Sequence, residues 1–311
     1  MKYLSSRLSK WMPNKQPVQV DSHPRLSGIM DTVNSTLAHG PETRLPSEFY
    51  DQKLIDIINR ISVEEWFAGF DQNNEYRTLG IGPLAGDIVA RMLGKIEASG
   101  NDVLLEVGGR DGPGEGRGEE KSLMLALSGC HDTTLAALLT SLGSFAGERW
   151  PPYTSHVAIE LFKDTARADG EGPINKPLNR PATATSAGHQ NESQTGTTLM
   201  SWLGLSRSKQ LATESIARKR LSDLTSSETQ KLNGYFVRLR YNDRPMTIPG
   251  CKPLGRHWKG DDSFCTLEAF KGIVDSFTPM DWKDECLRNL DSPATKEGER
   301  PAGVEKGEKR L

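Results

Sequence analysis

The stretch Lys121–Leu142, KSLMLALSGCHDTTLAALLTSL, decides how the rest of the chain is interpreted. Its first part, Ser122–Leu127, is almost entirely apolar, which is typical of a strand buried on both faces of a parallel sheet. The pair Ser128-Gly129 ends this run, and Asp132 or Thr133 can then cap a helix with apolar residues at helical spacing. The stretch therefore predicts a strand, a turn and a helix in succession.

His131 and Asp132 lie at the turn of this predicted unit. In open α/β sheets, ligands collect outside the carboxyl ends of the strands, and the amino end of a helix offers unpaired N–H groups to an anion. A His-Asp pair alone is weak evidence, because a turn followed by a helix cap also explains it. The pair is a candidate anion site that needs support from the surrounding sequence.

The wider phrase Ser128–Leu138, SGCHDTTLAAL, resembles the "HD" motif of the histidine acid phosphatases, the second branch of the histidine phosphatase superfamily. Three later segments resemble the family's closing part in the same order: Pro249–Cys251, Cys265–Glu268 and Asp281–Cys286. The resemblance covers roughly residues 20–290, apart from one insertion. It implies an α/β fold, an incomplete phosphoglycerate mutase-like α/β sandwich, with a mostly helical subdomain beside it.

The resemblance also implies roles for individual residues. In that family a histidine attacks phosphorus and becomes a phosphohistidine without a metal. Three arginines and the HD histidine hold the phosphoryl oxygens, and the HD aspartate protonates the leaving oxygen. Carried over to this sequence, His131 holds phosphate, Asp132 is the general acid, and both bind substrate together with Thr133. The implied activity is hydrolysis of small-molecule phosphomonoesters with no cofactor and no metal, a chemistry that needs mainly alignment and positive charge around phosphorus.

The nucleophile motif of that family, Arg-His-Gly-x-Arg-x-Pro, does not occur in these 311 residues. Ala38–Pro41 has the His-Gly pair, but no arginine precedes His39 and none stands two residues after Gly40. Apolar residues at helical spacing before it and a proline after it make this phrase typical of a helix end. Without an attacking imidazole the route through a covalent intermediate is closed.

Two interpretations therefore remain open. The chain is either an acid phosphatase of this family, truncated and weakly active or inactive as printed, or a non-catalytic remnant or interaction protein that reuses the fold. Whether it is an enzyme is left undecided. In the family, the segment missing here includes a first strand inside the sheet, beside the HD strand, so its absence predicts unpaired apolar strand edges.

Composition divides the chain into five parts. They are an N-terminal lead-in (1–20), a mostly helical subdomain (21–100), an α/β core (101–164 and 228–290), a low-complexity insertion expected to be largely disordered (165–227), and a charged, disordered tail (291–311). Apolar spacing predicts helices over Pro24–His39, Pro46–Ile61, Val63–Phe70 with Ser62 as its cap, and Glu75–Ile96.

Alternating patterns predict three strands in the α/β core: Val103–Val107, Thr154–Lys163 and Tyr235–Tyr241. The last two are expected to pair as an antiparallel edge. Within the second strand, His156 is interpreted as structural, and Glu160 as a residue that could orient groups of the site.

Charge and hydropathy exclude several classes of protein. The net charge of -2 and the pI near 6.3 argue against a nucleic-acid partner. No apolar run is long enough to span a bilayer, and the basic start of the chain lacks the apolar region of a signal peptide. The location therefore stays open between the cytoplasm, if this start is real, and the secretory pathway, if an N-terminal segment is missing. A homodimer is also left open.

Four cysteines do not make a disulfide scaffold in a chain of this length. Cys130 is interpreted as a small buried residue. In secreted relatives the matching cysteines are bridged, so the resemblance implies a Cys251–Cys265 pair and makes Cys286 similar to a cysteine whose partner lies upstream of Met1. Reduced thiols are the alternative.

Overall fold

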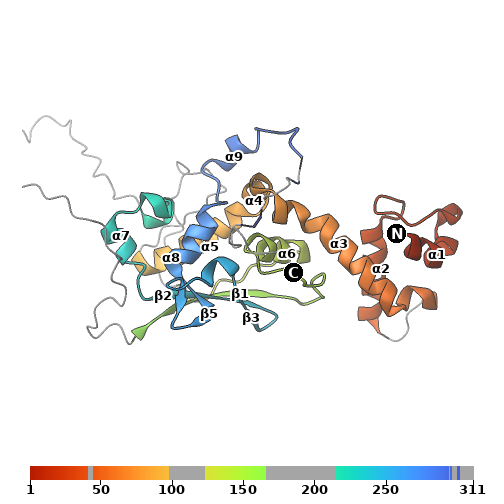
Figure 1. The fold of residues 1–311 in the computed structure, drawn as a ribbon, viewed down its shortest axis with the longest axis horizontal. Helices are drawn as coiled ribbons and strands as arrows, with labels where there is room; N and C mark the ends of the chain where they lie inside the picture. The colour runs from red at the N-terminus through yellow and green to blue at the C-terminus, as the bar shows by residue number, and fades with distance from the viewer. Residues whose placement is uncertain (41–44, 98–122, 166–214, 294, 296–299, 302–311) are drawn as a thin grey trace, which may run out of the picture.

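The computed structural model of the chain describes residues 1–40, 45–97, 123–165, 215–293, 295 and 300–301. In these residues, helices and one antiparallel sheet form an elongated molecule (Figure 1). The long helix α3, Gln52–Gln72, runs from one end of it toward the sheet. At 21 residues this helix is about 30 Å long, enough to connect two separate hydrophobic cores.

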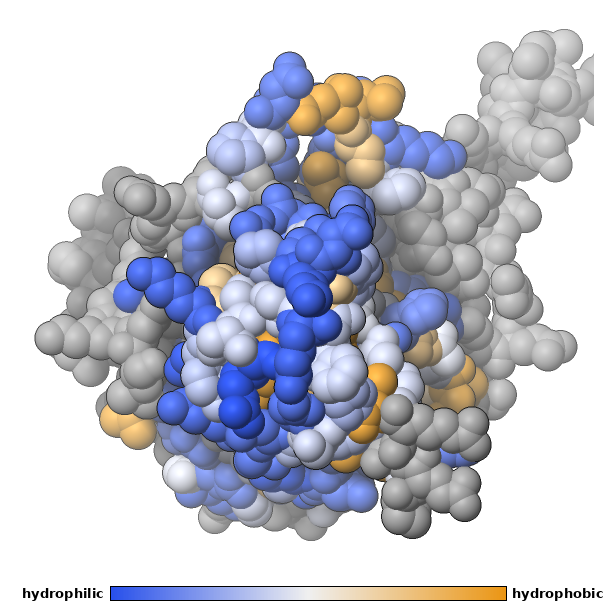
Figure 2. Space-filling view, turned by 90° about the vertical axis from the view of Figure 1, so that its right-hand side faces the viewer, coloured by the Kyte–Doolittle hydropathy of each residue, from blue (hydrophilic) through white to orange (hydrophobic). Residues whose placement is uncertain are grey.

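The first core lies in the N-terminal lobe, which we define as residues 1–61. Its elements are α1 (Lys2–Leu8), η1 (Ser9–Trp11), η2 (Pro13–Lys15), α2 (Leu26–His39), η3 (Ser47–Tyr50) and the first half of α3. Leu4, Leu8 and Val18 are buried in this core, so the segment expected to be a lead-in packs as part of the lobe. The surface at this end of the molecule is mostly hydrophilic (Figure 2).

The second core lies between one face of the sheet and the helices α4 (Asn74–Gly80), α5 (Gly82–Glu97), α6 (Asp132–Ser141) and α8 (Leu267–Asp275). Figure 1 shows α5, α6 and α8 on the same side of the sheet. Fully buried side chains from these helices include Leu93, Leu139 and Phe270. Burial of such apolar residues is the main contribution to the stability of this part.

The sheet is antiparallel throughout the described residues. Its strands are β1 (Val157–Lys163), β2 (Tyr235–Tyr241), β3 (Arg244–Met246), β4 (His257–Trp258) and β5 (Asp261–Thr266), in the order β1-β2-β5-β4, with β3 also paired to β2. The predicted antiparallel pairing of β1 with β2 is confirmed, in register from Val157 opposite Tyr241 to Lys163 opposite Tyr235. Asn242 and Asp243 turn the chain from β2 into β3 with positive φ angles, as a tight hairpin requires.

Short elements complete the described fold. They are η8 (Ile216–Arg218), η9 (Leu221–Asp223), α7 (Ser226–Gln230), η10 (Pro249–Cys251) and α9 (Trp282–Glu285). The expected strand Val103–Val107 and residues 166–214 of the expected low-complexity insertion lie outside the described residues. The end of that insertion is ordered and not part of a disordered segment, because η8 and η9 lie in it and Ile216 is buried in the second core. Among the described helices, none is both long enough and apolar enough to cross a membrane.

The strand predicted over Ser122–Leu127 is wrong for the part that the structure describes. Residues 123–131 have neither strand nor helix structure, and their side chains are exposed. Met124 and Leu127 are 84% and 87% exposed. The described strands are also antiparallel rather than parallel. A strand gains its backbone hydrogen bonds only from neighbours, and no described strand pairs with this segment.

Two helix boundaries also differ from the prediction. Ser62 does not cap a helix, because α3 continues through it and its side chain is fully buried. The helix predicted over Glu75–Ile96 is divided into α4 and α5 near Ile81. At Gly82 the chain passes so close to α8's end that a Cβ atom would lie 2.1 Å from the carbonyl oxygen of Phe277. Only glycine fits this contact.

Candidate functional site

His131 and Asp132 lie at the amino end of α6. His131 occupies the N-cap position with an extended backbone, and Asp132 is the first helical residue. The Asp132 Oδ1 atom accepts a hydrogen bond from the backbone N–H of Thr133 at 2.7 Å. The prediction that Asp132 or Thr133 is the cap is therefore wrong by one residue, while the predicted helix is confirmed. Both His131 and Asp132 are exposed to solvent.

The position of this helix end is determined by the burial of the rest of α6. The segment from Ala136 to Leu142 is buried in the second core, and Leu139 and Leu142 have no exposed surface. The helix also packs against α3. With its carboxyl half fixed in this way, the amino end of α6 faces solvent with the positive end of the helix dipole, which favours an anion.

A tryptophan that the sequence analysis did not single out holds the Asp132 carboxylate. The indole Nε1–H of Trp150 donates a hydrogen bond to Asp132 Oδ2 at 2.6 Å. The backbone N–H of Trp150 in turn donates to the Asn59 side-chain oxygen of α3 at 3.0 Å. Asp132 thus receives one hydrogen bond at each carboxylate oxygen, from Thr133 and from Trp150. These two contacts restrict the direction in which the carboxyl group points.

The loop that carries Trp150 is attached to the N-terminal lobe by neighbouring side chains. Arg149 forms an ion pair with Asp56 on α3, and the Tyr153 hydroxyl lies 2.9 Å from the Ser35 hydroxyl of α2. The Trp150 ring packs against Phe67 with ring centroids 5.2 Å apart. No local spacing signals these contacts, because they depend on how the loop folds against α2 and α3.

The other residues considered in the sequence have different surroundings. His156 precedes β1 and lies 3.5 Å from an Asp243 carboxylate oxygen, exposed at the hairpin turn. Glu160 on β1 accepts a hydrogen bond from Arg238 Nε at 2.8 Å and lies 3.6 Å from Arg240. The hydrogen bond from Arg238 lowers the pKa of Glu160. These contacts tie Glu160 to the arginines of β2.

His39 ends α2, followed by Gly40 with a φ of 118°. The prediction that this phrase terminates a helix is confirmed. Within the described ranges, no group of three or more His, Cys, Asp or Glu side chains is arranged to hold a metal ion.

The cysteines divide into one bridged pair and two free thiols. Cys251 and Cys265 form a disulfide with a Cα–Cα distance of 5.2 Å, which is the pair that the resemblance implies. Cys130 is free and exposed, so the interpretation as a buried residue is wrong. It belongs to residues 123–131, with which no strand of the described residues pairs. Cys286 is half-buried, and burial together with Glu285 raises the pKa of its thiol.

Comparison with known proteins supports the resemblance carried by these residues. Residues 27–176 match the model of the histidine phosphatase superfamily (branch 2). The chain is 31% identical over 283 residues to a protein of Schizosaccharomyces pombe described as a probable acid phosphatase. That match covers 91% of this chain and 51% of the relative, so the chain spans about half the length of the curated relative. No solved structure matches the chain significantly.

Proposed function

We propose, from the match of residues 27–176 to the histidine phosphatase superfamily (branch 2), that this chain supplies the phosphate-holding and proton-donating half of an acid phosphatase site. The observation that carries this proposal is the position of Asp132, exposed at the amino end of α6 with its carboxylate hydrogen-bonded by Thr133 and Trp150. The substrate is a small phosphomonoester.

His131 and the amino end of α6 hold the phosphoryl group in this proposal. A protonated imidazole supplies positive charge next to the phosphoryl oxygens, where phosphoryl transfer needs it. The helix end adds a dipole contribution of about 0.3–1 kcal/mol for a nearby anion. Thr133 contributes to substrate binding from the first turn of this helix.

Asp132 acts as the general acid. Its protonated carboxyl group donates a proton to the oxygen that leaves phosphorus, so that the leaving group departs as an alcohol and not as an alkoxide. General acid catalysis of this kind contributes typically about 10²–10⁴ in rate. The hydrogen bond from Trp150 keeps the carboxyl group oriented for this transfer.

The attacking histidine is not supplied by these 311 residues, since they contain no Arg-His-Gly-x-Arg-x-Pro phrase. We infer that residues 1–311 alone hydrolyse phosphomonoesters weakly or not at all. Removal of one essential member of a catalytic set usually costs nearly as much as removal of the whole set. Binding of phosphate, which needs no attacking histidine, can nevertheless be tested in this chain.

A nuclear magnetic resonance titration with inorganic phosphate in acetate buffer at pH 5 tests this proposal. We expect the ring resonances of His131, assigned through the His131→Gln variant, to move with added phosphate. His156 is the matched control, because it is exposed as well but lies at the hairpin turn beside Asp243. A response of His156 equal to that of His131, or no response of His131, would contradict the proposal.

The second candidate function is that of a non-catalytic interaction protein. It is favoured by the exposed apolar segment Leu123–Leu127, because large exposed apolar patches mark sites of association. A homodimer formed through this segment would sediment as a dimer, and the double substitution Leu125→Ser with Leu127→Ser would return it to a monomer. Dimerisation without any phosphate response at His131 would favour this function over the first.

A further inference from the structure

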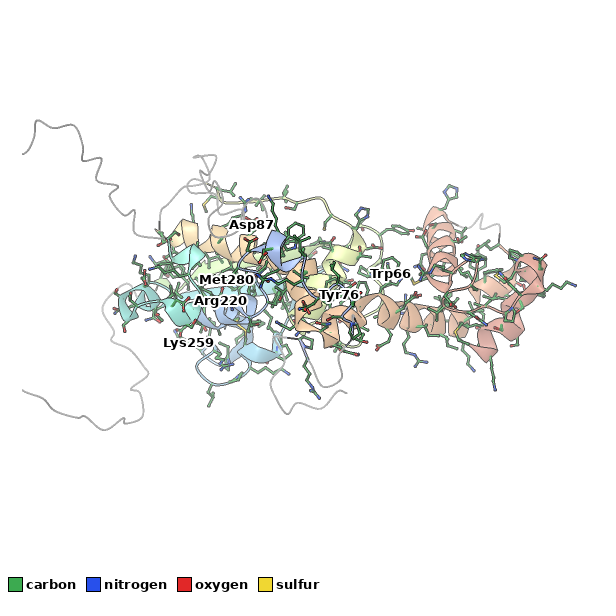
Figure 3. The ribbon with its side chains drawn as sticks, turned by 90° about the horizontal axis from the view of Figure 1, so that it is seen from above. Trp66, Tyr76, Asp87, Arg220, Lys259 and Met280 are labelled. Atoms are coloured by element: carbon green, nitrogen blue, oxygen red, sulfur yellow. A yellow bond between two sulfur atoms is a disulfide. The ribbon has the colours of Figure 1, made fainter. Side chains whose placement is uncertain are left out.

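Trp66 is exposed beside Trp150, the hydrogen-bond partner of the candidate acid. It lies on α3, and 43% of its surface is accessible to solvent. Figure 3 shows it on the part of α3 that connects the N-terminal helices with the rest of the molecule. Its ring meets the ring of Trp150 edge to face, with centroids 5.7 Å apart and an angle of 89° between the planes. Trp150 is the residue that donates its indole N–H to Asp132.

The two tryptophans differ in how firmly they are held. Trp150 is half-buried, packs against both hydrophobic cores, contacts Phe67, and has its backbone N–H bonded to Asn59. Trp66 instead leaves much of its ring uncovered. A large aromatic ring exposed to this extent, next to a second ring that is half-buried, offers apolar contact area to a ligand.

The position of the reacting oxygen connects these rings to substrate choice. A general acid must lie about 2.6–3.2 Å from the oxygen that it protonates. The Trp150 indole nitrogen lies 2.6 Å from Asp132 Oδ2. A leaving oxygen protonated by Asp132 Oδ2 would therefore bring its carbon skeleton near the indole of Trp150, whose ring the Trp66 ring meets. Aromatic rings interact favourably at centroid distances of about 4.5–7 Å.

We propose that Trp66 and Trp150 form a leaving-group subsite that selects phosphomonoesters of aromatic or other planar alcohols over those of small alkyl alcohols. This proposal rests on the proposed function, because it takes Asp132 as the acid. Trp150 forms the fixed wall of the subsite, and Trp66 forms the exposed wall that determines specificity. Aromatic contacts of this kind correspond to a dissociation constant about 2- to 12-fold lower for an aromatic ligand than for an alkyl ligand.

Binding of two stable phosphonates tests the subsite without any need for turnover. Phenylphosphonate and methylphosphonate carry the same anionic group on an aromatic and on an alkyl carbon. Isothermal titration of the full chain at pH 5 gives the ratio of their dissociation constants. We expect phenylphosphonate to bind about 2- to 12-fold more tightly. The Trp66→Ala variant should bring the ratio close to 1 and leave methylphosphonate binding unchanged, while Trp66→Phe should keep part of the preference.

Trp11 provides the matched control. It is exposed to a similar extent, 47%, but lies on η1 in the N-terminal lobe, so Trp11→Ala should keep the wild-type ratio. An equal affinity of the wild-type chain for both phosphonates, or an unchanged ratio in Trp66→Ala, overturns the subsite and leaves the proposed function standing. If neither phosphonate nor inorganic phosphate binds, the proposed function fails and the subsite fails with it. Thermal unfolding of each variant shows whether it is folded.

Discussion

Helix α6 and the segment before it, residues 123–131, are consecutive parts of the stretch Lys121–Leu142 and have opposite environments. In α6 the residues from Ala136 to Ser141 are buried, whereas every residue of 123–131 is exposed. We call residues 123–131 the approach segment. A helix satisfies its backbone hydrogen bonds within itself, so α6 needs only a core to pack against. A strand needs another strand beside it, and no described strand supplies one here.

The comparison shows that the prediction of a strand depends on whether another strand is available to pair with it. The approach segment begins with the composition of a strand buried on both faces, and it is exposed, with no strand of the described ranges paired to it. The strands β1 and β2 also have strand patterns, and they pair over seven residues each because both are present in the described chain. The difference between these regions is the availability of a partner.

The largest expected effect comes from a cavity in α6. Leu139 has no exposed surface, so Leu139→Ala should lower the free energy of unfolding by about 2–5 kcal/mol. Leu127→Ala removes the same atoms from the exposed approach segment and should change stability by less than about 0.5 kcal/mol. Urea denaturation measures both values. Similar costs for the two variants would show that the approach segment is buried in solution.

The disulfide extends the comparison to β5, a strand that pairs with β2 and β4. The Cys251–Cys265 bridge joins η10 to β5 across a sequence separation of 14 residues. Loss of a bridge that closes a loop of this size should cost about 3 kcal/mol, so Cys251→Ala with Cys265→Ala should clearly lower the melting temperature. Cys130→Ala, in the approach segment, is the control and should leave it nearly unchanged. The comparison fails if Cys130→Ala destabilises the chain as much as the loss of the bridge.

The approach segment should also tolerate a charge. Leu125→Lys places a charged side chain at a position that is 72% exposed, so stability should stay within about 0.5 kcal/mol of the parent. Less self-association is expected, because the substitution interrupts an exposed apolar run. Light scattering and urea denaturation on the same samples measure both effects. A loss of stability similar to that of Leu139→Ala would mean that Leu125 is packed.

The smallest expected effect on stability concerns a short helix that buries no side chain. Helix α7 has no buried residue and begins with a capping box between Thr225 and Glu228. Hydrogen bonds from Lys219 and Thr225 lower the pKa of Glu228 from 4.5 to about 2. Because the folded-state pKa is lowered, the stabilising contribution is present above pH 4.5 and is lost as the pH falls toward 2.

The Glu228→Gln variant provides the control for this pH dependence. Glutamine does not titrate, so the difference in unfolding midpoint between the parent and the variant should shrink as the pH falls from 4.5 toward 2. A difference that stays constant over this range would show that the charge of Glu228 does not stabilise α7.

Local patterns predicted the elements that depend mainly on their own residues. Helical spacing identified α2 and α6, and alternation identified β1, β2 and their pairing. In the candidate site, the helix start at His131-Asp132 was predicted from the local phrase, and the role of these two residues stays a prediction. These predictions need no information about distant parts of the chain.

The features that sequence could not reveal depend on tertiary contacts. The division between α4 and α5 follows from the approach of Phe277 to Gly82, more than 190 residues later in the chain. Likewise, Trp150 reaches Asp132 only because its loop is held against α3 by Asn59 and Asp56. Burial of Ser62 within α3 has the same origin, since nothing in the local phrase distinguishes it from a cap.

Hydrolysis of p-nitrophenyl phosphate at pH 5 by residues 1–311 and by the Asp132→Asn variant, without added metal, tests the central claim most directly. The claim is that these residues hold phosphate and deliver a proton but do not supply the group that bonds to phosphorus. We expect both proteins to give rates close to the uncatalysed reaction. Rapid turnover by residues 1–311 that the Asp132→Asn substitution removes would contradict the claim, because it would require a nucleophile within this chain.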